Sequence, residues 1–171
     1  MKKMILMAAL VAAPFMQNAF AQTDSSAFRS VISSYLNVKN ELINSNGDSV
    51  RAAAKNLYQA IADVPMEKLT STQNKVWKQY QEKLSYDAEH MKQTDELEHQ
   101  REHFAKLSIN FFKMLKALNV NTTDLYYQFC PMANDNKGAY WVSEDAKIRN
   151  PYFGKRMMTC GSTKETISPK K

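Results

Sequence analysis

The chain has little glycine, proline or cysteine: 171 residues include four Gly, five Pro and two Cys. So little Gly and Pro excludes a collagen-like chain or one made mostly of linkers. Hydrophobic residues make up 44% of the sequence, which excludes a disordered chain. The length is that of about one domain, and such a chain can bury a stable core without a metal or a disulfide. Any metal or disulfide is therefore expected to serve function or local structure.

The first residues have the features of a signal peptide. A basic start is followed by an apolar run, Met4–Phe15, and by the small-x-small site Ala19–Ala21 before Gln22. The run is too short to span a bilayer, so we expect residues 1–21 to be removed on export. A retained signal anchor is the alternative. No Cys stands at the cleavage point, so no lipid anchor is expected. Residues 22–171 are then expected to form a single soluble domain, periplasmic or secreted.

The excess of basic over acidic residues is mild, and it is scattered along the chain. The formal net charge of +6 falls to +4 without Lys2 and Lys3. No block of arginine and aromatic residues resembles a nucleic-acid surface, so no nucleic-acid partner is expected. Beyond the first residues, no segment is apolar enough to cross a membrane. The protein is therefore not expected to span a membrane.

Four amphipathic helices are expected between about residues 25 and 118. In each, apolar side chains recur at steps of three and four residues, which places them on one face of a helix. The connections are short, and short connections favour antiparallel neighbours. The sequence therefore predicts a mainly α fold, an antiparallel four-helix bundle.

Local signals indicate where these helices begin and end. The first is expected over about Ser25–Ser45. Asp48 is the expected cap of the second, which Pro65 ends. The third begins at the capping-box pattern Thr70–Gln73, and Asp95 is the expected cap of the fourth.

The chain changes character at about Asn119, where helical periodicity is lost and aromatic residues and glycines crowd together. Short strands are expected at Leu125–Cys130 and Ala139–Val142, with a loop of turn-forming residues between them. The segment of about 119–162 is too small for a core of its own. We expect an aromatic-rich loop with a short β-hairpin, packed on the bundle. The polar residues after about Ser162 are expected to fray.

Both cysteines have methionine neighbours. Met132 follows Cys130 by two residues, and Met157 and Met158 precede Cys160. Thiolates and thioethers are soft ligands that select Cu(I) or Ag(I), while Zn(II) can bind through the thiolates and an imidazole. Side chains two apart lie on one face of an extended chain, which favours Met132 and Met158 as partners of the thiols. The alternatives are a Cys130–Cys160 disulfide, which an oxidising location favours, and methionines that only fill a core.

Histidines can complete such a site. His99 and His103 are one turn apart on the fourth helix, a spacing at which two imidazoles can share a metal. The apolar stripe predicts His103 at the edge of the buried face, beside the docked C-terminal segment, and His99 nearer to solvent. His103 is therefore the expected ligand, and a packed edge-of-core side chain is the alternative. His90 lies on a charged face and is not expected to take part.

Five stretches of the sequence resemble an exported family of domains of unknown function. Members of this family occur alone or attached to the periplasmic adaptor subunits of copper and silver efflux pumps. The resemblance covers nearly all of the chain after the leader. It is carried by Gln100–Ser108, by Leu125–Tyr126 with Cys130–Ala133, and by Asn136–Ser143, Ile148–Gly154 and Met157–Gly161.

The resemblance implies metal handling. It implies a periplasmic heavy-metal-binding accessory protein that binds Cu(I) or Ag(I), with Zn(II) as second choice, in metal efflux or tolerance. Its implied partners are the ion and a periplasmic efflux adaptor protein. By position, it points to His103, Cys130, Met132, Met157 and Cys160 as ligands. The resemblance thus favours Met157 as the ligand, whereas strand geometry favours Met158. The choice between the two methionines stays open.

The alternatives to a metal-binding protein are an interaction module and an enzyme. A non-catalytic interaction module would use the bundle as a binding surface and a Cys130–Cys160 disulfide as a staple. An enzyme is not expected, because the sequence has no Ser-His-Asp set, phosphate loop or zinc-protease pattern. The cysteines are also thirty positions apart, unlike the Cys-x-x-Cys pair of redox enzymes.

Overall fold

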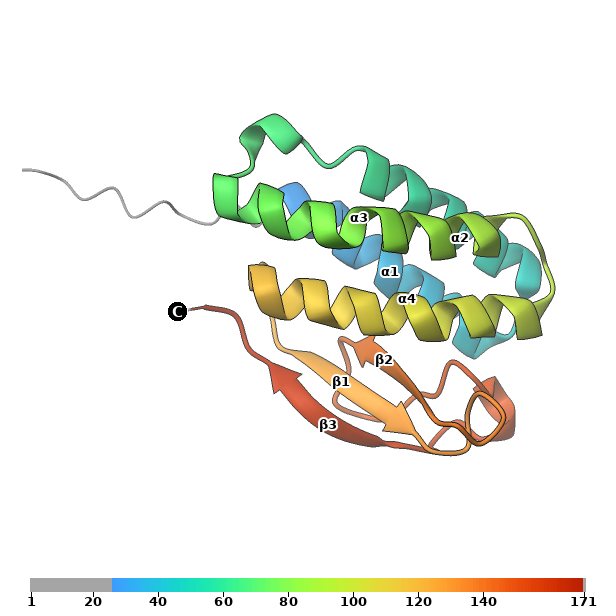
Figure 1. The fold of residues 1–171 in the computed structure, drawn as a ribbon. Coiled ribbons are helices and arrows are strands. Elements are labelled where there is room, and N and C mark those ends of the chain that lie inside the picture. Colours follow the sequence, from blue (N-terminus) through green and yellow to red (C-terminus); the bar gives the residue numbers. More distant parts are fainter. Residues whose placement is uncertain (1–25, 171) are drawn as a thin grey trace, which may run out of the picture.

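A computed structural model describes residues 26–170, in which four helices lie against a small antiparallel sheet (Figure 1). The signal peptide expected at residues 1–21 lies outside the described residues. The helices are α1 (Ser26–Asn44), α2 (Gly47–Ala62), α3 (Ser71–Lys92) and α4 (Leu97–Leu118). The strands are β1 (Leu125–Cys130), β2 (Ala139–Ser143) and β3 (Ser162–Ile167), and short 3-10 turns lie at Met66–Lys68 and Gly154–Arg156.

The helices form the predicted bundle, in which each helix packs against the next one in the sequence (Figure 1). The capping box before α3 is confirmed, because Thr70 accepts from the Gln73 N–H while the Gln73 side chain accepts from the Thr70 N–H. The predicted cap of α2 is wrong. Asn46 is the cap, since its side chain accepts from the Ser49 N–H, and Asp48 lies in the first turn. None of the helices within residues 26–170 is both long and apolar enough to span a membrane.

The loop between α3 and α4 is held by a buried amide and not by a helix cap. Glu96 occupies the cap position of α4 and makes no side-chain cap bond among the described residues, so the prediction of Asp95 is wrong. Instead, the Gln100 amide group donates to the carbonyls of Thr94 (2.7 Å) and Gly47 (2.9 Å). These two bonds fix the loop against the start of α2. They also fix the first turn of α4.

Tyr35 of α1 occupies the centre of the core. Its ring stacks on Phe111 at a centroid distance of 3.8 Å and lies 5.4 Å from Phe104. Its hydroxyl lies 2.7 Å from Ser108 Oγ and accepts from the Val142 N–H at 3.0 Å. One side chain therefore joins α1 and α4 to the second strand.

The sheet has the strand order β2-β1-β3, and both pairs are antiparallel. The two strands predicted from the sequence are confirmed. The third was not predicted, and the expectation that residues after Ser162 fray is wrong. This segment pairs with β1 from Leu125 opposite Ile167 to Phe129 opposite Ser162. The Asn121 amide also donates to the Ile167 carbonyl at 2.9 Å, which holds the end of the strand.

Both faces of the sheet are covered. Tyr127 stacks on Phe112 of α4, with ring centroids 3.6 Å apart. The next residue, Gln128, belongs to the other face, because successive side chains of a strand alternate. Its amide donates to the carbonyls of Asp145 (2.9 Å) and Ala146 (3.3 Å) in the loop after β2. The C-terminal aromatic residues therefore pack on the bundle, as predicted.

A buried ion pair joins α1 to the end of β2. Lys39 is fully buried, and its Nζ donates to Glu144 at 2.7 Å and to Ser143 Oγ at 3.3 Å. Asn40 donates to the second carboxylate oxygen of Glu144 at 3.1 Å. Burial lowers the pKa of Lys39, and the adjacent carboxylate partly opposes this effect. The pair therefore holds the sheet to the bundle through one desolvated ammonium group.

Candidate metal centre

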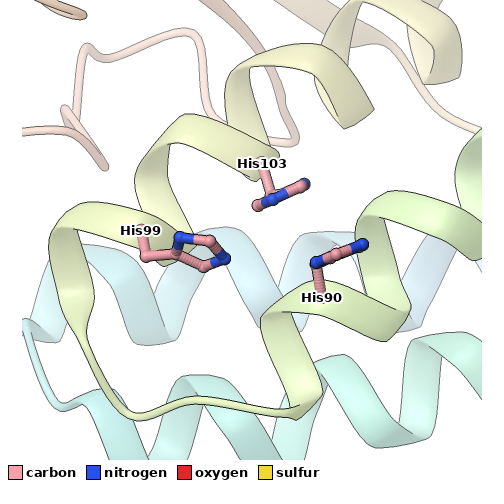
Figure 2. Close-up of side chains that lie close together, drawn as sticks. All are labelled: His90, His99 and His103. Carbon is pink, nitrogen blue, oxygen red and sulfur yellow. The ribbon is translucent and has the colours of Figure 1, made fainter.

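Three histidines from α3 and α4 meet beside the loop that joins these helices. Figure 2 shows their rings turned toward one another. One ring nitrogen from each of His90, His99 and His103 lies within 4.8 Å of the other two. Three imidazoles are a typical ligand set for Zn(II) or Cu(II). Nitrogens bound to one tetrahedral ion at about 2.1 Å lie about 3.4 Å apart, so binding requires the rings to turn further inward.

The antiparallel α3–α4 hairpin brings these residues together. His90 lies two residues before Lys92, the last residue of α3, and His99 lies two residues after Leu97, the first residue of α4. Positions equally far from the turn lie opposite each other in such a hairpin. His103 follows His99 by one helical turn and therefore lies on the same face. The rings of His90 and His103 are parallel, with centroids 4.5 Å apart.

A carboxylate orients one of the three rings. Asp87 lies on α3 one turn before His90, and its Oδ1 is 2.9 Å from His103 Nδ1. Both residues are buried, with 3% of Asp87 and 6% of His103 exposed. When the Nδ1–H of His103 donates to this carboxylate, Nε2 carries the free lone pair. Metal-binding histidines commonly have such a carboxylate behind them, which fixes the ring and raises its basicity.

The electrostatics of the site favour a neutral His103. Burial lowers the pKa of His103, and the neighbouring His90 and His99 act in the same direction, while Asp87 acts in the opposite one. Burial raises the pKa of Asp87, and its hydrogen bond with His103 opposes that rise. A metal ligand has to be deprotonated. The environment of His103 therefore supplies the protonation state that a metal ligand needs.

The cluster is accessible from one side. His90 and His99 are half-buried, and Tyr86 beside them is 56% exposed. The Tyr86 ring lies 4.4 Å from the His90 ring and 6.0 Å from the His103 ring. Three protein ligands leave a fourth position of a tetrahedral ion for water or another ligand. An ion held here therefore has a route to and from solvent.

The two cysteines form a second cluster, at the sheet. Cys130 is the last residue of β1 and is fully buried, while Cys160 precedes β3 and is half-buried. Both are free thiols in the described chain, with their sulfurs 2.6 Å apart. The hydrogen bond to Cys130, together with burial, raises the pKa of Cys160 to about 11. The structure therefore brings the two predicted thiol ligands into contact.

The remaining predicted ligands are more dispersed. The Met157 carbonyl accepts from the Cys160 N–H at 3.1 Å, so this residue lies near the thiols. Met132 is 49% exposed and lines a cavity of about 590 Å³ between the start of α4 and the β1–β2 turn. His103 contacts α3, and no cysteine belongs to its ligand group among the described residues.

Two sequence predictions about the histidines differ from this geometry. His103 was expected to face the C-terminal segment, and it faces Asp87 and His90 of α3 instead. His90 was expected to take no part, yet it belongs to the ligand group. The reason is that α4 is buried on two sides, by α3 and by the sheet, so its apolar stripe does not indicate where each border residue points. The equal distances of His90 and His99 from the turn are the sequence signal that identifies the group.

The fold and the histidine cluster define a class: a four-helix bundle with a small sheet and a candidate metal centre between two helices. A family model described as a protein of unknown function (DUF3347) matches residues 31–123. The match covers more than half of the chain, and the chain belongs to this family. The matched segment includes all three histidines and neither cysteine. Comparisons with curated proteins and with solved structures found no match.

Proposed function

We propose that this protein binds a divalent transition-metal ion, Zn(II) or Cu(II), through His90, His99 and His103, and that its function is metal handling. The observation that carries the proposal is the meeting of three imidazoles from two helices within 4.8 Å. The Asp87–His103 hydrogen bond adds the carboxylate that such ligands commonly have behind them.

The ligand chemistry selects among ions. Ca(II) and Mg(II) take oxygen ligands and are not expected to bind three imidazoles. Imidazole suits Zn(II) and Cu(II), and of these two Cu(II) generally binds a given nitrogen site more tightly. Cu(I) and Ag(I) prefer sulfur, which the histidine cluster lacks. The proposed histidine site therefore takes a different ion from the one expected for the thiol and thioether site predicted from the sequence.

The site suits an ion that is exchanged. Its half-buried imidazoles and its free fourth position favour release to a partner over permanent storage. This agrees with an accessory protein of metal efflux or tolerance, the role that the family resemblance implies. A periplasmic efflux adaptor as the recipient, and the periplasm as the location, are parts of the proposal that rest on that resemblance alone.

A second candidate is a Cu(I) or Ag(I) site in the reduced protein. It is supported by the contact between the sulfurs of Cys130 and Cys160 and by the closeness of Met157. Its ligands do not overlap with the histidine cluster among the described residues. Variants therefore separate the two candidates.

The test is a calorimetric titration of untagged, metal-free protein with Zn(II), and with Cu(II) in competition with a chelator. Replacing His90, His99 or His103 by Ala is expected to lower the affinity at least tenfold, or about 1.4 kcal/mol for one modest coordination bond. Asp87→Asn is expected to lower it by roughly 10- to 100-fold. Glu98→Ala is the matched control, because this exposed residue lies beside His99 but lines the cavity on the other side of α4.

The outcomes distinguish the candidates. Under the proposal, the control and a double Cys130→Ser, Cys160→Ser variant keep the affinity of the original protein for Zn(II). If the variant lacking all three histidines binds Zn(II) and Cu(II) as tightly as the original, the histidine site is refuted. If the histidine variants bind Zn(II) and Cu(II) as the original does, and the reduced protein binds Cu(I) in a parallel titration only when both cysteines are present, the second candidate replaces the first.

A further inference from the structure

We propose that Cys130 and Cys160 form an intramolecular disulfide that joins the end of β1 to the start of β3. These strands are antiparallel neighbours, and Phe129 pairs with Ser162. Continued by one residue, this register places Cys130 opposite Gly161. Cys160 then lies diagonally across from Cys130. The sulfurs lie 2.6 Å apart in the unbonded pair.

A buried asparagine holds Cys160 in place independently of any sulfur bond. The Asn150 amide donates to the Cys160 carbonyl at 2.8 Å, and the Asn150 N–H donates to the Met158 carbonyl at 2.8 Å. Its Oδ1 accepts from the N–H groups of Tyr152 and Phe153. Asn150 is fully buried. The loop that carries Cys160 is thus closed before oxidation, so forming the bond requires little further ordering.

The spacing of the sulfurs suits a covalent bond better than a shared ion. Two thiolates bound to one tetrahedral ion at about 2.3 Å lie about 3.8 Å apart. The sulfurs of Cys130 and Cys160 are closer than that, and the bond needs them to approach by about a further 0.5 Å. A metal would need the two sulfurs to separate by about 1.2 Å.

The oxidant can be a small disulfide such as oxidised glutathione. The Cys160 thiolate, the more exposed of the pair, attacks one glutathione sulfur; the glutathione S–S bond breaks and one glutathione thiolate leaves. The Cys130 thiolate then attacks the Cys160 sulfur and expels the second glutathione thiolate. The two thiol protons end on the two glutathione thiolates. Two cysteines are oxidised and one glutathione disulfide is reduced.

The test is equilibration of the full chain in glutathione buffers, followed by acid quenching, alkylation in denaturant and peptide mapping by mass spectrometry. With equal concentrations of reduced and oxidised glutathione, we expect a peptide pair linked through Cys130 and Cys160 and no alkylated cysteine. Reduction of this bond is expected to lower the ratio of folded to unfolded protein on the order of 500-fold, from the chain entropy of a loop of this length. The peptide mapping uses the chain without substitutions, so its result does not depend on whether a variant folds.

Single variants supply the controls. Cys130→Ala leaves the accessible Cys160, which is expected to form a mixed disulfide with glutathione. Cys160→Ala leaves the buried Cys130, which is expected to stay a thiol while the protein is folded. The proposal is overturned if both cysteines of the original chain are alkylated after equilibration with oxidised glutathione. Linkage only between molecules, or a metal ion retained on unoxidised sulfurs by elemental analysis, overturns it as well.

Discussion

The buried ion pair between α1 and β2 allows a sharp prediction of stability. The Lys39 side chain is fully buried, whereas 37% of the Glu144 side chain is exposed. Replacing Glu144 with Gln removes the negative charge and leaves a buried ammonium group with only neutral partners. Breaking a fully buried pair in this way costs roughly 3–5 kcal/mol. Because water reaches Glu144, we expect the free energy of unfolding to fall by less, about 2 kcal/mol.

The reverse change should have a different result. Lys39→Met removes the same ion pair, but it also removes the cost of burying the ammonium group. Glu144 can then be hydrated, and it keeps its hydrogen bond from Asn40. Replacing a buried charge with an apolar side chain of similar volume is often neutral or stabilising. We therefore expect Lys39→Met to stay within about 1 kcal/mol of the original protein.

Urea unfolding followed by circular dichroism measures both free energies in metal-free protein at pH 7. Burial alone would raise the pKa of Glu144, but hydrogen bonds from Lys39 and Asn40 lower it overall. The stability that this lowered pKa contributes is present above the ordinary pKa of a glutamate and is lost as the pH falls through the lower, folded-state value. Glu144→Gln should not show this loss. Equal destabilisation by Glu144→Gln and Lys39→Met would refute the reasoning, since it would mean that burying the ammonium group costs nothing.

Four further predictions concern the core, one turn and the histidine cluster. Tyr35→Phe leaves the buried Val142 N–H without its acceptor. The free energy of unfolding, measured in urea, should therefore fall by about 1–3 kcal/mol. An unchanged value would mean that another acceptor replaces the hydroxyl. Gly154→Ala should cost at least about 1 kcal/mol in the same assay, because Gly154 has φ +56 and a Cβ there would overlap Ser45 Oγ. Zn(II) affinity, measured by calorimetry, should weaken as the pH falls, because protons compete with the ion for its ligands. Burial lowers the pKa of His103, so the metal-free folded state should lose stability as the pH falls below the ordinary pKa of a histidine, and His103→Gln should reduce that loss.

The bundle was predictable because its signals are local. Apolar residues at helical spacing indicated four helices, and the capping box of Thr70 and Gln73 indicated the start of α3. The third strand was not predictable in this way. Ser162–Ile167 is mostly polar and lies at the edge of the sheet, where backbone pairing with β1 holds it and no apolar alternation is needed. Composition therefore suggested a frayed tail where the structure has a strand.

The candidate metal centre was predictable only in part. The spacing of His99 and His103 indicated that two imidazoles share a helix face, and both belong to the cluster. The third histidine, His90, and Asp87, which bonds to His103, come from the preceding helix. To find them from the sequence, one must know which residues of the two helices lie opposite each other. The pattern within one helix does not give this information. The cysteine pair was expected from the sequence, but the β1–β3 ladder that brings the two residues together depends on the unpredicted strand.

The histidine cluster lies within residues 90–103, on either side of one short loop. A denatured chain therefore keeps the three imidazoles near one another in sequence, and under the proposed function we expect it to retain affinity for the same ion. An ion stabilises the native state only by the difference between its affinities for the folded and the unfolded chain. The rise in melting temperature on adding Zn(II) or Cu(II) should thus be smaller than the affinity of the folded protein implies. Thermal-shift screening would underrate this site, and equilibrium titration of folded protein is the appropriate measure of its strength.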